Sequence, residues 1–348
     1  MKTIIRFHIS RKEYRNYYLM VVLILNFVTN SKAQEQFQLT NFIYSIHAIN
    51  PAFTGIEDAV NLNIGYRRQW AAVEGAPITY YAGFNGTLSA LKDAKPSRKT
   101  LRKSIPRYYG KLSKEPGSVH HGVGVYVSGE SYGPYQETSA YFTYSFMLQV
   151  SKSYLLAFGL STEYAIQHFN LNKISLYNPD LDQVYQNYAN SPSTISRLNF
   201  NAGVLIYGKN LFAGYSLHQF ASIRLSQNNF AESGYQGMYH FFTAGYNLSI
   251  GYQFTLQPST LVRYNKSFNL QADVITKLIY RELLWAGFLW SYDNAVGFLF
   301  GLRIANSLYL GYSYEYNTGD IGGYSQGTHE LVIGYRLFGD RNSSQFLW

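Results

Sequence analysis

The sequence contains no cysteine, which excludes disulfide bonds, thiolate catalysis and cysteine-ligated zinc. Charged residues make up only 14% of the chain, whereas a soluble domain normally has about a quarter. In their place are 34 tyrosines, 23 phenylalanines and 29 glycines, without a long apolar run. This composition is typical of a transmembrane β-barrel. The alternative is a soluble β-sandwich, which would usually have a more charged exposed face.

Residues 1–33 have the layout of a signal peptide. A basic leader precedes the apolar run 17–28, and the small residues Ser31 and Ala33 precede Gln34. The alternative is a membrane anchor, but this apolar run is well short of the roughly 20 residues that a spanning helix needs. We therefore expect export, with cleavage after Ala33.

The net charge of +9 does not describe the mature chain. The leader carries six Lys/Arg and one acid, so its removal lowers the net charge to +4. The segment 92–115 holds nine Lys/Arg and two acids, so the rest of the mature chain is slightly acidic. The positive net charge of the full sequence therefore comes from one segment and from the leader, which is removed. Because the rest of the chain is not basic, we expect no nucleic-acid partner.

Strand-like alternation begins in the stretch 50–88, after turn signals at Asn50-Pro51 and Gly55. Apolar residues at 60, 62, 64 and 66 alternate with polar or small residues at 61, 63, 65, 67 and 69. A break at 74–77 separates this run from a second alternating run, 78–88. The pattern predicts a β-hairpin, which a soluble sheet would also show.

The same alternation recurs to the C-terminus and decides the fold class. Further strands are predicted at 121–128, 135–150, 153–169, 196–207, 211–220, 237–248, 253–264, 268–280, 283–292, 296–304, 308–316 and 328–338. With the first hairpin they make an even number, as bacterial barrels require, and most are long enough to cross a bilayer at a tilt. We predict an all-β fold, a transmembrane antiparallel β-barrel of about 14 strands. It would span 59–338, between a periplasmic lead-in or plug at 34–58 and a tail at 339–348.

The connections predict an orientation. If the first strand starts in the periplasm, the long connections 170–195, 221–236 and 317–327 face outside, and most periplasmic connections are short. The basic stretch 91–118 breaks this rule, because it is long and falls on the periplasmic side. Either a strand is miscounted or this stretch is an inserted periplasmic loop.

Catalytic and metal-binding signals are few. The pairs His120-His121 and His329-Glu330 place their side chains on opposite strand faces, so neither pair chelates a metal. Glu163, Asp273, Lys277 and Glu315 fall on the predicted lumen face, where charges are ordinary. No nucleophile elbow or phosphate-binding loop is present. We expect no catalytic, cofactor-binding or metal-binding residue, and no enzymatic activity.

Five stretches carry a resemblance. QFQLTNFIYSIHAINPAFTG, then YRRQW and GAPITYYAGFNG, resembles the N-terminal signature of the PorP/SprF family of outer-membrane proteins, found in Bacteroidetes type IX secretion and gliding systems. HHGVGVYVSGESYGPYQETSAYFTYSF is similar to the family's next hairpin and THELVIGYRLF to its last strand. The resemblance implies a motif that either binds a partner or stabilises the structure, at Asn50, Pro51, Gly55, Tyr66, Arg67, Gln69, Trp70, Gly75, Pro77 and Thr79. All of these except Gly55 belong to the most specific part of the resemblance. The chain departs from the family pattern in its longer 91–118 segment and in Gly129-Glu130-Ser131.

The resemblance implies a location in the cell outer membrane, in contact with its lipid, and a function with the secretion machinery. Such a barrel would help to export or surface-anchor a partner, typically an adhesin with a type B C-terminal domain. It would also contact periplasmic components linked to peptidoglycan. The alternative is a porin or substrate-selective channel, which the same fold can serve.

Two further expectations concern particular residues. Arg67 on the lumen face is expected to pair with a carboxylate such as Glu163 or Asp273 and to fix the aromatic lead-in, while Trp70 would lie in an interfacial belt. Alternatively, both residues simply stabilise the barrel. The basic residues Lys95, Arg98, Lys99, Arg102 and Lys103 form either a periplasmic docking arm for an acidic partner or a tolerated insertion.

Overall fold

The computed structural model describes residues 40, 42–57, 59–92, 115–174, 185–186, 194–208, 210–226, 237–266, 268–281, 283–305 and 307–339. The chain divides into two compact units, Met1–Glu35 and Gln36–Trp348, and every described residue belongs to the second. The expected signal peptide, the tail from residue 340 and most of the basic segment, 93–114, lie outside the described residues.

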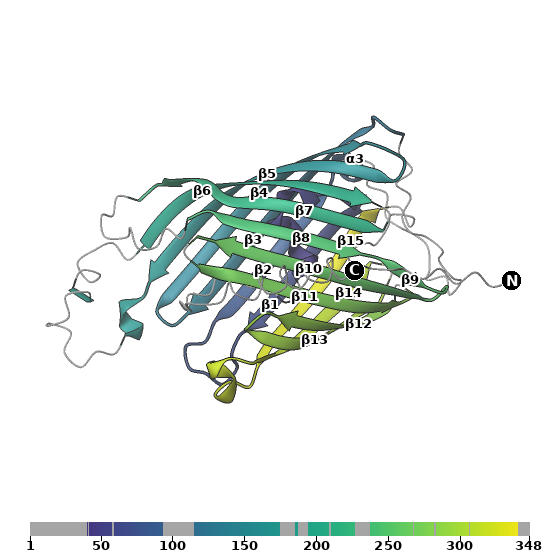
Figure 1. The fold of residues 1–348 in the computed structure, drawn as a ribbon. Coiled ribbons are helices and arrows are strands. Elements are labelled where there is room, and N and C mark those ends of the chain that lie inside the picture. The colour runs from purple at the N-terminus through teal and green to yellow at the C-terminus, as the bar shows by residue number, and fades with distance from the viewer. Residues whose placement is uncertain are drawn as a thin grey trace, which may run out of the picture. The chain divides into compact units, whose positions relative to one another are not determined.

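The described chain is dominated by antiparallel strands (Figure 1). In the first half they are β1 (Ala59–Arg68), β2 (Ile78–Thr87), β3 (Val119–Tyr132), β4 (Tyr135–Gln149), β5 (Tyr154–Phe169), β6 (Thr194–Gly208) and β7 (Leu211–Arg224). In the second half they are β8 (Tyr239–Tyr246), β9 (Leu248–Ile250), β10 (Phe254–Asn265), β11 (Phe268–Tyr280), β12 (Leu284–Ser291), β13 (Ala295–Arg303), β14 (Leu308–Asn317) and β15 (Thr328–Gly339).

These strands close into a barrel. Each pairs with its neighbours in sequence, and β1 also pairs with β15, with Tyr66 opposite both Tyr80 and Leu331. The strands β8 and β9 both pair with β10 and are separated only at Asn247, so they fill one place in the sheet. Over the described residues this gives the predicted 14 strand positions. Closure leaves no strand edge to be satisfied inside a membrane.

The two faces of the sheet follow the alternation in the sequence. On β1, Asn61, Asn63 and Arg67 are buried in the lumen, whereas Ile64 and Tyr66 are exposed on the outer surface. The outer surface carries large apolar residues on every side, among them Phe142, Leu160, Ile206, Phe242, Phe298 and Ile333. An apolar exterior around a polar interior is the arrangement of a barrel embedded in lipid.

The two ends of the barrel differ in their connections. One end holds the start of β1, the end of β15 and the short turns at 150–153, 209–210, 251–253, 281–283 and 304–307. The 88–118 connection also begins and ends there, with the short helix α3 (Leu88–Lys92). The opposite end holds the long connections 170–193, 225–238 and 318–327. The strand count is therefore correct, and the connection 88–118 starts and finishes at the end of the barrel where β1 begins and β15 ends.

Some strand ends were predicted wrongly. β7 continues to Arg224, past the predicted end at 220, because a left-handed residue at Gln219 (φ 56°) produces a bulge after which pairing with β6 resumes. β3 likewise runs on through 129–132, so Gly129-Glu130-Ser131 lies within a strand. Within the described ranges, no helix has the length and hydrophobicity to cross a membrane.

Candidate functional site in the barrel lumen

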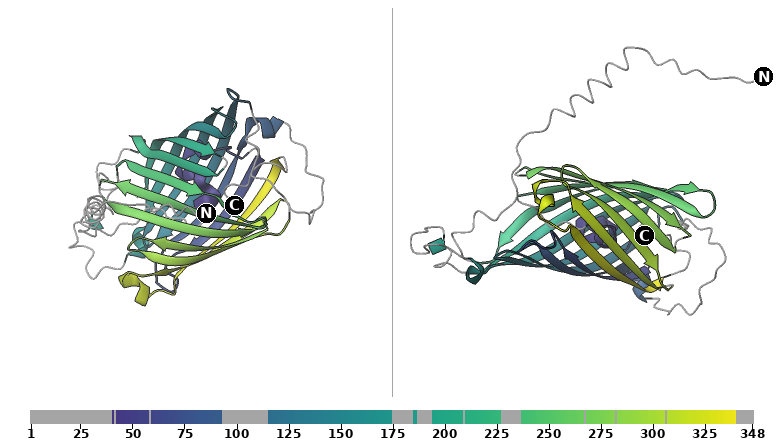
Figure 2. Two further views of the ribbon diagram at one scale, coloured as in Figure 1. Left: turned by 45° about the vertical axis from the view of Figure 1, so that its right-hand side comes forward. Right: turned by 90° about the horizontal axis from the view of Figure 1, so that it is seen from below.

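The lumen contains the N-terminal segment of the barrel unit. Its turns are η1 (Phe42–Ser45), α2 (Ile46–Ile49) and η2 (Pro51–Phe53), drawn in purple among the strands in Figures 1 and 2. Phe42, Tyr44, Ile46 and Phe53 are all buried, and Phe53 packs edge-on against Phe212 of β7. We call residues 40–57 the lumen segment. Its aromatic side chains pack in the barrel interior and are shielded from water.

Asn50 fixes the middle of the lumen segment. Its Oδ1 accepts a hydrogen bond from the Ala52 backbone N–H at 3.0 Å, which begins η2 with Pro51 in the first turn. Its Nδ2 donates to the carbonyl oxygens of Val204 on β6 and Tyr215 on β7, at 3.2 and 3.4 Å. Asn50 and Pro51 of the family signature therefore attach the segment to the barrel wall.

Glycines in the wall make this close approach possible. A Cβ on Gly203 would lie 2.0 Å from Asn50 Oδ1, and one on Gly159 would lie 2.2 Å from the Ala52 nitrogen. Gly55 has a left-handed φ of 69°, and a Cβ there would lie 2.8 Å from the Gly122 Cα. Gly122, Gly159 and Gly203 thus mark part of the surface on which the segment lies.

Polar side chains of the wall satisfy the segment's buried carbonyls. The Ile49 carbonyl accepts hydrogen bonds from Ser216 Oγ at 2.6 Å and from the His218 side chain at 2.5 Å, both on β7. The carbonyl of Thr54 accepts from Ser145 Oγ at 2.5 Å, and that of Tyr44 accepts from Asn63 Nδ2. Since unsatisfied buried backbone groups are costly, these bonds are needed for the segment to remain inside the barrel.

An ionic cluster holds the start of the lumen segment. Arg67 Nη1 lies 2.8 Å from Glu315 Oε1 and 3.4 Å from Glu330 Oε2. Glu330 also accepts from the Thr40 backbone N–H at 2.7 Å and from the Tyr81 hydroxyl at 2.9 Å. Arg67 donates in addition to the Thr40 hydroxyl. A single buried cation and two carboxylates therefore link β1, β14 and β15 to the segment.

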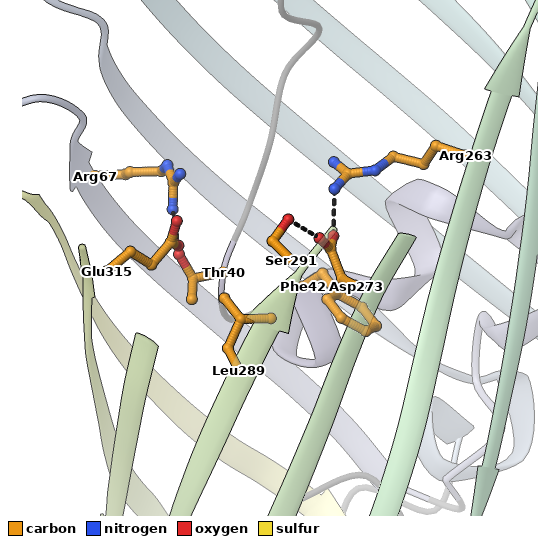
Figure 3. Close-up of a pocket in the computed structure, with 8 residues that line it drawn as sticks. All are labelled: Thr40, Phe42, Arg67, Arg263, Asp273, Leu289, Ser291 and Glu315. Atoms are coloured by element: carbon orange, nitrogen blue, oxygen red, sulfur yellow. Dashed lines mark hydrogen bonds and ion pairs between the residues drawn. The ribbon is translucent and has the colours of Figure 1, made fainter. Parts of the chain in front are cut away.

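The predicted partner of Arg67 was wrong. Asp273 pairs instead with Arg263 of β10 and accepts from Ser291 Oγ, and this second group faces the first across a small pocket lined also by Thr40, Phe42 and Leu289 (Figure 3). Glu163 accepts from Tyr141 at 2.8 Å and from Ser139 and Asn199 at 3.3 Å. The alternation in the sequence predicts whether a side chain faces the lumen or the outer surface. It does not predict which lumen side chains come into contact when the barrel closes.

Two further buried charged residues, Lys277 and Glu57, have structural contacts. Lys277 is buried beneath the Trp285 ring, with its Nζ 5.1 Å from the ring centroid. Glu57 at the end of the lumen segment pairs with Arg336 of β15 and accepts from Asn61 Nδ2 at 3.0 Å. Among the described residues, no group of His, Asp and Glu side chains is arranged to hold a metal ion.

The rest of the signature forms the rim of the barrel. The Gln69 N–H donates to the Pro77 carbonyl at 2.9 Å and closes the β1–β2 loop, while Gly75 adopts a left-handed φ of 71°. Trp70, also left-handed, lies beyond the end of β1 and donates its backbone N–H to Thr328 Oγ1 at 3.3 Å. Thr79 returns to the lumen face. These residues order one rim, and the interfacial position of Trp70 stays a prediction.

Burial controls the charge of the one histidine in the lumen segment. His47 is 2% exposed, with Tyr126 packed edge-on and Asn85 Nδ2 3.3 Å from its Nδ1. Burial lowers the pKa of His47 to about 4, so its imidazole is neutral at physiological pH. A neutral ring is compatible with the apolar packing around α2.

Comparison with known proteins gives one family. The model of the family described as type IX secretion system membrane protein PorP/SprF matches residues 31–335. No curated protein matches the chain. Among solved structures, it resembles the Acinetobacter baumannii outer membrane protein Omp33 (11% identity, TM-score 0.42, 81% of this chain and 99% of that one). It also resembles the TodX monoaromatic hydrocarbon channel (9% identity, TM-score 0.44, 84% of this chain and 93% of that one). A third similar structure is Escherichia coli outer membrane phospholipase A (10% identity, TM-score 0.33, 81% of this chain and 90% of that one).

Proposed function

Because this chain belongs to the type IX secretion system membrane protein PorP/SprF family, we propose that it is an outer-membrane accessory barrel that helps to export or surface-anchor a secreted protein. The partner class is an adhesin with a type B C-terminal domain. The barrel is the part that anchors the protein in the membrane, and the rims and loops of the barrel hold the secreted partner. Gliding motility is one process in which such anchoring would be used.

The occupied lumen is the observation that favours attachment over conduction. The lumen segment is hydrogen-bonded to β1, β4, β6, β7 and β15, and Tyr44 stacks on Tyr309 of β14. An open porin instead keeps a water-filled channel through its barrel. A filled barrel is a rigid support for exposed loops, which is what an anchor requires.

The orientation supports the same function. By analogy with barrels whose periplasmic turns are short, the end that holds the start of β1 and the end of β15 faces the periplasm. The loops 170–193, 225–238 and 318–327 then face outside, where a secreted protein would be held. The connection 88–118 begins and ends at the periplasmic end, and the basic residues in its sequence are suited to an acidic, peptidoglycan-linked partner.

Planar-bilayer recording and co-purification together distinguish the two functions. We expect the intact chain to conduct poorly and to co-purify with a secreted adhesin from its own cells. Deleting residues 34–49 removes the contacts of Thr40 with the ionic cluster and the buried side chains of Phe42, Tyr44 and Ile46, so conductance should rise. Steady conductance of the intact chain, without a co-purified secreted protein, would instead support the porin.

A further inference from the structure

Arg68 is unusual among the charged residues of the barrel. It is exposed at the last position of β1, and its side chain points away from the lumen because its neighbour Arg67 points in. On the strands that the structure describes, every other charged side chain lies on the lumen face, by its burial or by its place in the alternation. The outer surface of these strands therefore carries one fixed charge.

The neighbours of Arg68 on the outer surface are polar aromatic residues. Arg68 lies opposite His329 of β15 and Ile78 of β2. His329 Nδ1 is 2.8 Å from the Tyr312 hydroxyl, and its ring packs against Tyr314 at 5.2 Å between centroids. One row nearer the middle of the barrel, Tyr66 packs against Tyr80 at 5.2 Å. We call Arg68, His329, Tyr66, Tyr80 and Tyr312 the rim patch.

The rim patch lies where the apolar surface ends. Below it, exposed Ile64, Leu331 and Ile333 face the hydrocarbon, and above it the loops 69–77 and 318–327 begin. Tyrosines of this kind mark the membrane–water boundary of barrels. The guanidinium of Arg68 is therefore at the depth of the lipid headgroups.

A cation at this depth needs an anion, and the surrounding strands provide none. Arg68 makes no hydrogen bond or ion pair to a described residue, and the outer surface of the described strands carries no carboxylate. Guanidinium binds phosphate through two parallel hydrogen bonds, and imidazole and phenol groups are additional donors. In the outer leaflet, the abundant phosphate carrier is the glycolipid of the membrane itself.

We propose that the rim patch binds a phosphate group of lipopolysaccharide, with Arg68 as the principal ligand and His329 as the second. The assignment to lipopolysaccharide rests on the proposed orientation, in which this end faces the cell surface. It is independent of which secreted protein the barrel holds. The bound glycolipid would fix the height and rotation of the barrel, and so the direction in which its loops point.

Native mass spectrometry of the full chain, purified gently from outer membranes, tests this proposal. The unaltered protein should retain lipopolysaccharide, and Arg68→Gln should retain about tenfold less because a charge-assisted pair is lost. Arg68→Lys should retain an intermediate amount, because lysine keeps the charge but cannot make two parallel hydrogen bonds. Lys152→Gln is the matched control, since Lys152 is an exposed cation in a turn at the opposite end. Equal retention by Arg68→Gln and the unaltered protein would overturn the proposal.

A second measurement separates the possible phosphate sources. Delipidated protein is mixed with lipopolysaccharide, dephosphorylated lipopolysaccharide or phosphatidylglycerol, and its thermal unfolding is recorded. Stabilisation by the phosphorylated glycolipid alone, lost in Arg68→Gln, is the expected result. Equal stabilisation by the dephosphorylated form would reject phosphate recognition. Equal stabilisation by phosphatidylglycerol would reject the assignment to lipopolysaccharide.

Discussion

At the scale of single residues, the neighbours Arg67 and Arg68 have opposite environments. Arg67 neutralises two buried carboxylates, so Arg67→Gln leaves Glu315 and Glu330 facing each other without a cation. Breaking a buried pair in this way costs about 3–5 kcal/mol. We expect Arg67→Gln to release the start of the lumen segment, measured as faster protease cleavage near Thr40 in the folded barrel. Arg68→Gln is the control and should be cleaved at the same rate as the unaltered protein. Equal cleavage rates for the unaltered protein, Arg67→Gln and Arg68→Gln would show that the ionic cluster does not hold the lumen segment.

Gly203 allows a second test at the same scale. Gly203→Ala places a methyl group against Asn50 Oδ1, and overpacking of this kind costs about 1–3 kcal/mol. The lumen segment should then be displaced at Asn50, with a lower unfolding temperature in detergent. Gly129→Ala provides the control, because a Cβ at Gly129 meets no atom within 4 Å. If the two variants unfold alike, the wall glycines are not needed for the segment to bind.

His47 makes the packing of the lumen segment sensitive to acid. Its pKa is about 4 in the folded barrel against about 6.5 when released, so the folded state disfavours the protonated ring. The contribution of the neutral ring is complete above pH 6.5 and is lost as the pH falls towards 4, where the loss approaches about 3 kcal/mol. Protease access to the lumen segment should therefore increase between pH 7 and pH 4. His47→Gln should show a smaller increase, and an identical pH profile would exclude His47 as a cause.

At the scale of elements, the sequence predicted the strands well, but it predicted poorly which lumen side chains contact each other. A period of two fixes the face of each residue, which is why the lumen positions of Arg67, Glu163 and Asp273 were predicted correctly. The Arg67 partners Glu315 and Glu330 lie some 250 residues away, on strands that meet β1 only when the barrel closes. The short helical turns of 42–53 have no long period, so composition alone indicated a buried segment there.

The basic segment is a separate element, and its function stays a prediction. Replacing Lys95, Arg98, Lys99, Arg102 and Lys103 with Gln should leave barrel assembly intact, because the described strands close the barrel without these residues. Co-purification of periplasmic partners and surface display of the secreted protein should both fall. The difference in co-purification from the unaltered protein should narrow at high salt, because salt weakens docking that is held by charge. Normal display and normal co-purification would mean that the segment is a tolerated insertion. A cysteine introduced at Ser104 and labelled from outside whole cells would show that this end faces the surface.

At the scale of the whole molecule, the closed barrel with its internal segment gives the chain a rigid body and two distinct ends. Even strand number and low charge predicted the barrel, since lipid requires every backbone group to be paired. The contacts that fill the lumen could not be predicted in the same way, because they depend on shape complementarity between a short segment and a wall built from distant strands. The resulting architecture is a closed barrel with the connections 170–193, 225–238 and 318–327 at one end and the connection 88–118 at the other.

Surface display of the secreted partner tests the central claim most directly. The amount of adhesin removed by protease from whole cells is measured in a strain that lacks this chain and in the same strain supplied with it. The account predicts little adhesin on the surface without the chain, with adhesin retained inside the cells or released into the medium, and normal display when the chain is restored. Unchanged display in the strain that lacks it would contradict the account.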